Sequence, residues 1–143
     1  DERIEGITLL GGEPVAHAAG AAALAEAVQR RGLSVMVFTG HELEAIQADA
    51  SPEVAALLRN TDILVDGPYI RELPDSKRRW IGSQNQRIHF LTDRYRADDP
   101  CWRSPDTLEI RLAAGELRVN GFPAQSAVEI WKRPRKLPNA TES

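Results

Sequence analysis

The run Gly11-Gly12-Glu13-Pro14 has the composition of a turn that could bind a polar ligand. It follows an apolar stretch, Ile4–Leu10, and precedes an Ala-rich one, Val15–Arg31. Two glycines let a ligand approach the backbone closely, and Glu13 adds a carboxylate. The alternative is a tight strand-to-helix turn with an incidental acidic residue. Neither a P-loop nor a dinucleotide fingerprint is present, so phosphate binding of those kinds is not predicted.

Two other apolar stretches also end in polar side chains. Thr39 and His41 flank a glycine, and Asp66 ends the next stretch. The Asp66 carboxylate could bind a hydroxyl or ammonium group, or it could cap the following turn. His41 could contact a ligand or begin the next helix. His17 and His89 lack partners at metal-ligand spacing, so we predict that they are structural or surface residues.

An uncharged, amide-rich run that ends in arginine lies further along the chain: Gly82-Ser83-Gln84-Asn85-Gln86-Arg87. Its density of side-chain donors and acceptors exceeds what a plain loop needs, which makes Gly82, Ser83, Asn85, Gln86 and Arg87 candidate site residues. The alternative is a polar turn before a strand. No Ser/His/Asp or Cys/His set stands out, so a hydrolase is not indicated.

Alternating strands and helices must position these residues. We predict buried strands at Ile4–Leu10, Ser34–Thr39 and Asp62–Asp66, a further strand at Arg87–Thr92, and helices at Val15–Arg31, His41–Ala48 and Ser51–Arg59. Apolar strands that alternate with helices indicate a parallel α/β architecture with both sheet faces covered. Ligands of such sheets bind beyond the carboxyl ends of the strands, where the three glycine-containing tips should converge.

The character of the chain changes after residue 92. We predict a linker at Arg94–Pro105, a β-hairpin formed by Leu108–Leu112 and Glu116–Asn120, and a disordered polar tail from Pro134. The basic run Lys132–Lys136 fits a solvated tail better than a nucleic-acid site. We therefore divide the chain into an α/β part, residues 1–92, and an extension, residues 93–143.

Composition excludes several classes of protein. A chain of 143 residues suits one core, and its formal net charge of -3 gives no general attraction to nucleic acid. No apolar run is long enough to span a bilayer, and no signal peptide is recognisable. Cys101 is the single cysteine, so an internal disulfide is excluded. The cytoplasm is the expected compartment.

Four segments together resemble the radical S-adenosylmethionine (SAM) activating enzymes, above all the activating proteins of anaerobic ribonucleotide reductase. They match in order and spacing within Ile4–Leu91, and they are Ile7–Pro14, Val35–Ile46, Ile63–Leu73 and Trp80–Ile88. The resemblance implies a partial (β/α) barrel of the radical SAM type, which the predicted β-hairpin would extend at its C-terminal side. It also implies a [4Fe–4S] cluster, held by a C-x3-C-x2-C loop, that cleaves SAM to a 5′-deoxyadenosyl radical.

The resemblance also assigns roles to residues and names partners. Gly11, Gly12 and Glu13 would contact the amino end of SAM, and Thr39 and Asp66 would be further members of the SAM site. The radical would abstract hydrogen from a glycine of a partner, a glycyl-radical enzyme such as anaerobic ribonucleotide reductase. An electron donor such as flavodoxin or ferredoxin would reduce the cluster.

The chain departs from the family pattern at the cluster. The cysteine loop normally precedes Gly-Gly-Glu, but only ten residues precede Gly11 and none is cysteine. We expect that the first βα unit is missing from this sequence and that the chain alone is inactive. One alternative is a cluster-less binding or interaction module that retains the fold. A third hypothesis is an α/β enzyme that uses Asp66 and His41 without SAM.

Overall fold

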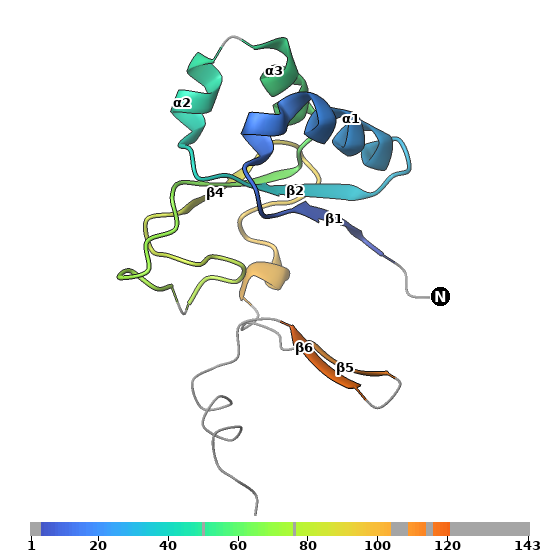
Figure 1. Cartoon of the computed structure of the whole chain (residues 1–143), viewed down its shortest axis with the longest axis vertical. Coiled ribbons are helices and arrows are strands. Elements are labelled where there is room, and N and C mark those ends of the chain that lie inside the picture. Colours follow the sequence, from blue (N-terminus) through green and yellow to red (C-terminus); the bar gives the residue numbers. More distant parts are fainter. Residues whose placement is uncertain (1–3, 50, 76, 104–108, 114–115, 121–143) are drawn as a thin grey trace, which may run out of the picture.

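The computed structural model describes residues 4–49, 51–75, 77–103, 109–113 and 116–120, and Figure 1 shows their arrangement. The strands of the main sheet are β1 (Gly6–Leu9), β2 (Ser34–Phe38), β3 (Ile63–Asp66) and β4 (Arg87–Phe90). The α-helices are α1 (Ala18–Gln29), α2 (Leu43–Ala48) and α3 (Pro52–Arg59), and short 3-10 helices cover Pro14–His17 and Pro100–Arg103. All the predicted strands and helices of the α/β part are present, although both are shorter than predicted, and the predicted helix Val15–Arg31 begins as a 3-10 helix.

The four strands form one mixed sheet in the order β1-β2-β3-β4. β1, β2 and β3 are parallel, with Ile7 opposite Val35 and Val37 opposite Leu64. β4 runs antiparallel to β3, with Val65 opposite Ile88. The reason is the connection: the described residues between β3 and β4, 67–75 and 77–86, form no helix that could carry the chain back across the sheet, as a parallel pair requires.

The helices cover one face of the sheet (Figure 1). Small residues on α1 allow it to pack closely on the sheet and on α3, and they share a core with the apolar side chains of α3, β2 and β3; its buried members are Ala22, Ala25, Val28, Val35, Val37, Leu57 and Leu64. Removing this apolar surface from water stabilises the fold at roughly 25 cal/mol per Å². The helices therefore fix the sheet from one side only.

A second core covers the opposite face. Its buried members are Met36, Ile63, Val65 and Ile81, and partly buried aromatic residues pack against them. Trp102 lies at the centre of the aromatic group, with its ring 5.1 Å from that of Phe90 and 6.2 Å from that of Tyr95. Part of the predicted linker Arg94–Pro105 thus packs against the sheet, because its two aromatic residues cover apolar strands.

The predicted β-hairpin is confirmed. β5 (Glu109–Ala113) pairs antiparallel with β6 (Glu116–Asn120), and Ile110 lies opposite Val119. The predicted polar tail from Pro134 and the basic run Lys132–Lys136 lie outside the described residues. Within the described part of the chain, no helix is long and apolar enough to cross a bilayer. The partial barrel and the division at residue 92 stay predictions.

Candidate functional site

The carboxyl ends of β1, β2 and β3 meet at one rim of the sheet. The backbone N–H of Thr39 donates a hydrogen bond of 3.0 Å to the carbonyl oxygen of Val65, and that of Gly67 donates one of 3.0 Å to the carbonyl oxygen of His41. The loop that follows β1 joins them through the side chain of Glu13. The predicted convergence of the three glycine-containing tips is therefore confirmed.

Glu13 holds this rim together. Its Oε1 atom accepts hydrogen bonds from the Thr39 hydroxyl group, at 2.8 Å, and from the backbone N–H of Val15, at 3.0 Å. Its Oε2 atom accepts one of 2.9 Å from the backbone N–H of Gly40. Burial by itself raises the pKa of Glu13, but the three donors together bring that pKa below the ordinary value. The carboxylate is thus ionised and held between two loops.

The two glycines before Glu13 are needed for their backbone conformation. Gly11 has a φ of 92° and Gly12 a φ of 59°, values that residues with a side chain rarely adopt. A Cβ atom at either position would meet nothing within 4 Å, so crowding is not the reason for glycine here. Both residues are exposed, and a hollow of about 250 Å³ lies beside Gly11 and Glu13. Their backbone groups are therefore open to a ligand.

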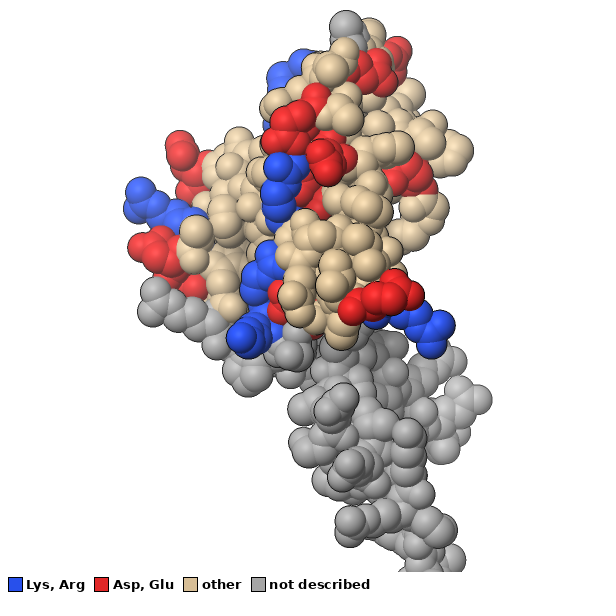
Figure 2. Space-filling view, turned by 90° about the vertical axis from the view of Figure 1, so that its left-hand side faces the viewer, with Lys and Arg blue, Asp and Glu red and all other residues tan. Residues whose placement is uncertain are grey.

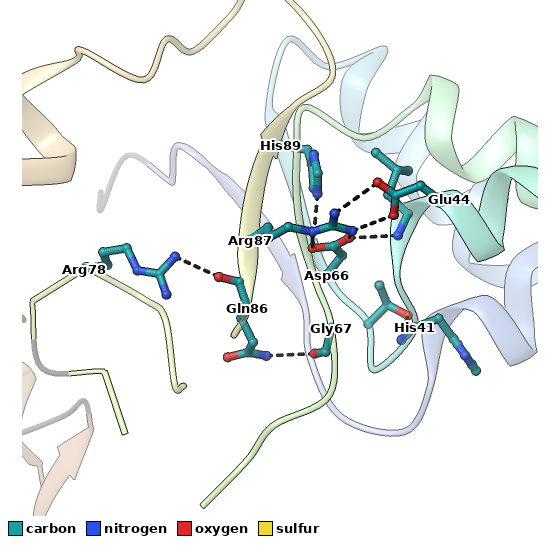
Figure 3. Close-up of polar contacts among 10 residues, drawn as sticks. His41, Glu44, Asp66, Gly67, Arg78, Gln86, Arg87 and His89 are labelled. Carbon is teal, nitrogen blue, oxygen red and sulfur yellow. Dashed lines mark hydrogen bonds and ion pairs between the residues drawn. The ribbon is translucent and has the colours of Figure 1, made fainter. Parts of the chain in front are cut away.

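Asp66 lies beneath the rim and is fully buried (Figure 3). Its carboxylate accepts hydrogen bonds of 2.8 Å from the backbone N–H of Leu43 and 3.1 Å from the Nε atom of Arg87. The Nε2 atom of His89 lies 3.1 Å from its Oδ1 atom. Burial alone raises the pKa of Asp66, but Arg87, Leu43 and His89 outweigh it and bring that pKa below the ordinary value.

Asp66 therefore joins β3 to β4 and to the start of α2. The Arg87 guanidinium extends this link, because it also pairs with the exposed Glu44 at 3.0 and 2.6 Å. The two carboxylates hold the pKa of Arg87 above its ordinary value. In Figure 3 the His41 side chain points away from Asp66. The geometry gives no pairing of Asp66 with His41, which the non-SAM enzyme hypothesis requires.

The amide-rich run organises the loop that precedes β4. The Oε1 atom of Gln86 accepts hydrogen bonds of 3.1 Å from the backbone N–H groups of both Gly82 and Ser83, and its Nε2 atom donates one of 3.2 Å to the carbonyl oxygen of Gly67. Asn85 donates one of 2.7 Å to the carbonyl oxygen of Pro68. These contacts favour the polar-turn interpretation, and they anchor the turn to the rim through Gly67.

Sequence reasoning missed several residues that order the sheet and the loop before β4. Arg78 donates a hydrogen bond of 2.7 Å to the carbonyl oxygen of Gln86 (Figure 3). Arg78 also binds the Asp75 carboxylate at 2.6 Å. At the other end of the sheet, the buried Asp62 accepts a hydrogen bond of 2.8 Å from the backbone N–H of Val35. The i, i+3 spacing of Asp75 and Arg78 is a usable signal for that pair. The contacts that join segments far apart in the sequence leave no local pattern from which they could be predicted.

A sequence family described as a 4Fe-4S single cluster domain matches residues 1–89. The chain belongs to this family. Its resemblance to activating proteins is also confirmed: it is 36% identical over 98 residues to the anaerobic ribonucleoside-triphosphate reductase-activating protein of Escherichia coli K12, covering 64% of this chain and 60% of the relative. The Vibrio cholerae protein of the same description is 37% identical over 99 residues, which cover 64% of this chain and 61% of that protein.

A phage relative has the same description. The protein of Enterobacteria phage T4 is 32% identical over 94 residues, covering 63% of this chain and 56% of the relative. The chain thus spans about three fifths of the length of the curated relatives it matches. No solved structure gives a significant match.

The residues of this 4Fe-4S family member do not fit an iron–sulfur cluster by themselves. Such a cluster is held by several thiolates, and the sequence contains the single cysteine Cys101. Among the described residues, no group of three or more His, Cys, Asp or Glu side chains could hold a metal ion. The SAM contacts predicted for Gly11, Gly12, Glu13, Thr39 and Asp66 stay predictions.

Proposed function

We propose that this chain is the SAM-binding part of a radical SAM enzyme that activates a glycyl-radical enzyme such as anaerobic ribonucleotide reductase. The family match and the descriptions of the relatives support the reaction class. The single structural observation that carries the proposal is the Glu13 carboxylate, which ties the exposed Gly11-Gly12 turn to the end of β2. That arrangement presents backbone groups at the rim where ligands of such sheets bind.

The donor set at this rim fits the amino-acid end of SAM. A carboxylate has about four acceptor positions, and Glu13 uses three of them for Val15, Thr39 and Gly40. Its Oε2 atom keeps one for an ammonium group. The exposed N–H and C=O groups of the two glycines can bind the remaining polar atoms. Thr39 and Asp66 would contribute to SAM binding by fixing the positions of the loops that contact it.

The chemistry expected of bound SAM is reductive cleavage at a [4Fe–4S] cluster to give a 5′-deoxyadenosyl radical. The cluster needs thiolates that this sequence does not supply, so we expect no SAM cleavage by these 143 residues alone. The role proposed for the chain's own residues is to bind and orient SAM: the negative charge of Glu13 selects the ammonium group, and the positive-φ glycines keep the backbone open beside it.

Calorimetric titration of the chain with SAM, in the absence of iron, tests the binding role. We expect heat of binding for the wild type and an affinity about tenfold weaker for Glu13→Gln, since this change removes the charge but keeps the shape. Glu26→Gln, on the exposed face of α1, is the matched control and should bind like the wild type. Absence of binding by the wild type would contradict the proposed role.

A cluster-less binding module is the second candidate, and the single cysteine favours it. The two functions separate when the gene is read upstream of the codon for Asp1. A C-x3-C-x2-C loop there, with 5′-deoxyadenosine formed by the reconstituted full-length protein, supports the activating enzyme. An open reading frame without such a loop, together with SAM binding by the chain, supports the module.

A further inference from the structure

The β3–β4 loop, described at residues 67–75 and 77–86, exposes several large apolar side chains and buries several polar ones. Tyr69 is 63% exposed, Leu73 42% and Trp80 36%, and they are three of the six large hydrophobic residues exposed in the described part of the chain. Ser83 and Gln86, by contrast, are buried. Soluble folds usually do the opposite, and exposed apolar residues gathered on one segment mark a binding surface.

This β3–β4 loop is held in one conformation by its buried polar groups. The Ser83 hydroxyl group accepts a hydrogen bond of 3.1 Å from the backbone N–H of Ile70, and the Gln84 N–H donates one of 2.8 Å to the carbonyl oxygen of Leu73. The Arg78 guanidinium donates hydrogen bonds to three backbone carbonyl oxygens of the segment just before β4. A partner would therefore meet a preorganised surface, which reduces the entropy lost on binding.

Tyr69 is fixed without being buried. A Cβ atom placed on Gly82 would lie 3.0 Å from the Cδ2 atom of Tyr69, so the ring rests directly on the glycine backbone. A larger residue at position 82 would push the ring away. Rigid, exposed aromatic rings are the usual anchors of protein interfaces, because they offer a large contact area with little rotamer freedom to lose.

Trp80 adds a second aromatic group under backbone strain. Its φ of 65° makes it the one non-glycine residue with positive φ among those described. A bulky residue is unfavourable in this region and is kept only where surrounding contacts hold it. The Trp102 ring, 5.1 Å away, and the Arg79 guanidinium, 4.2 Å from the ring centre, supply those contacts. The Trp80 ring is therefore held against Trp102 and Arg79, beside the amino ends of β1 and β2.

The charges on the loop indicate what kind of partner fits. Arg71 and Lys77 are exposed cations, and Glu72 is the one exposed carboxylate beside them. The Asp75 carboxylate is used by Arg78 within the loop. Figure 2 faces the side of the molecule from which the loop projects in Figure 1, and it shows Lys and Arg side chains, with Asp and Glu side chains near them, around uncharged surface. A segment with acidic and apolar side chains complements this combination.

We propose that the β3–β4 loop is a docking surface for a protein partner, and that it binds a segment with acidic and apolar side chains. Tyr69 and Leu73 make the apolar contacts, and Arg71 and Lys77 select the acidic ones. Trp80 packs on Trp102 beside the amino ends of β1 and β2, so it is not part of this surface. The loop is bonded to the rim, since Gln86 donates to the Gly67 carbonyl oxygen, so docking there brings the partner next to the candidate SAM site. Only the identity of the partner, the reductase, rests on the proposed function; the docking surface itself does not.

The test measures binding of the full chain to the purified anaerobic ribonucleotide reductase encoded in the same genome, by biolayer interferometry at fixed salt. We expect Tyr69→Ala to weaken binding at least tenfold, and the double variant Arg71→Glu/Lys77→Glu to weaken it similarly and to remove its salt dependence. Leu24→Ala, an exposed apolar change on α1, is the control and should bind like the wild type.

Several results would overturn the docking surface. The first is that the wild type does not bind the reductase. The second is that the loop variants bind the reductase with an affinity within twofold of the wild type. The third is that the chain forms a Tyr69-dependent dimer and does not bind the reductase. Titration of the same preparations with SAM separates the two proposals. If the chain binds the reductase in a Tyr69-dependent way but does not bind SAM, the proposed SAM role is wrong and the docking surface still stands.

Discussion

The Thr39 hydroxyl group donates a hydrogen bond of 2.8 Å to the Oε1 atom of Glu13, across 26 residues of sequence. The same hydroxyl oxygen accepts a hydrogen bond of 3.2 Å from the backbone N–H of His41. Thr39 is 4% exposed, so these two hydrogen bonds are shielded from water. The position of the β1 loop therefore depends on the turn that ends β2.

Thr39→Val should show this dependence. The change keeps the shape of the side chain but removes a donor to an ionised carboxylate, so we expect a loss of about 1.5 kcal/mol in the free energy of unfolding. SAM affinity should fall several-fold, because Glu13 is less firmly held. Urea unfolding and calorimetry measure the two quantities. Thr8→Val, at an exposed position of β1, is the control for the free energy of unfolding, and an equal loss in the two variants would argue against this link between the loops.

The stability of the protein should fall in acid because of Glu13 and Asp66. The pKa of each is lower in the folded protein than its ordinary value, so each stabilises the fold above the unfolded-state pKa. That contribution is lost as the pH falls below about 4 and through the lower folded values. Urea unfolding between pH 7 and pH 3 should show a smaller decline for Glu13→Gln than for the wild type. Parallel curves would contradict this assignment.

Asp66→Asn tests the anchor beneath the rim. Asparagine fits the space but cannot balance the Arg87 guanidinium, so we expect the free energy of unfolding to fall by about 2 kcal/mol. The start of α2 should also loosen, because the Leu43 N–H loses a charged acceptor. Hydrogen exchange at residues 40–46 measures the second effect. Glu44→Gln changes an exposed partner of the same arginine and should leave both measurements near the wild-type values.

The sequence was sufficient for the order of elements and for the three strand tips. Apolar runs bounded by glycine identify β2 and β3, and the Ser51-Pro52 pair predicts the start of α3, where Ser51 accepts a hydrogen bond from Val54. The direction of β4 could not be predicted, because it depends on the path of the whole loop before it. Nor could the partners of Asp66, since its contact with Arg87 spans 21 residues and depends on strand register.

Two glycines of this fold should respond in opposite ways to substitution by alanine, because one is tightly packed and the other has open space around it. A Cβ atom on Gly6 would overlap the hydroxyl and carbonyl oxygens of Ser34, where β1 meets β2. Because the carbonyl group belongs to a paired strand, it cannot move away, and Gly6→Ala should cost about 2 kcal/mol. Gly20 lies within α1 and has open space around it, so Gly20→Ala should gain about 0.5 kcal/mol from helix propensity.

Thermal unfolding of both variants checks this pair. A gain for Gly20→Ala shows that alanine itself is tolerated, so a loss for Gly6→Ala then reports the close approach of β1 to β2 and no general effect of the substitution. Since β1 leads directly to Gly11 and Gly12, the Gly6→Ala variant should also bind SAM more weakly, whereas Gly20→Ala should bind it unchanged. If Gly6→Ala is as stable as the wild type, β1 lies further from β2 than the structure has it, and the position of the Gly11-Gly12 turn relative to Thr39 would have to be revised with it.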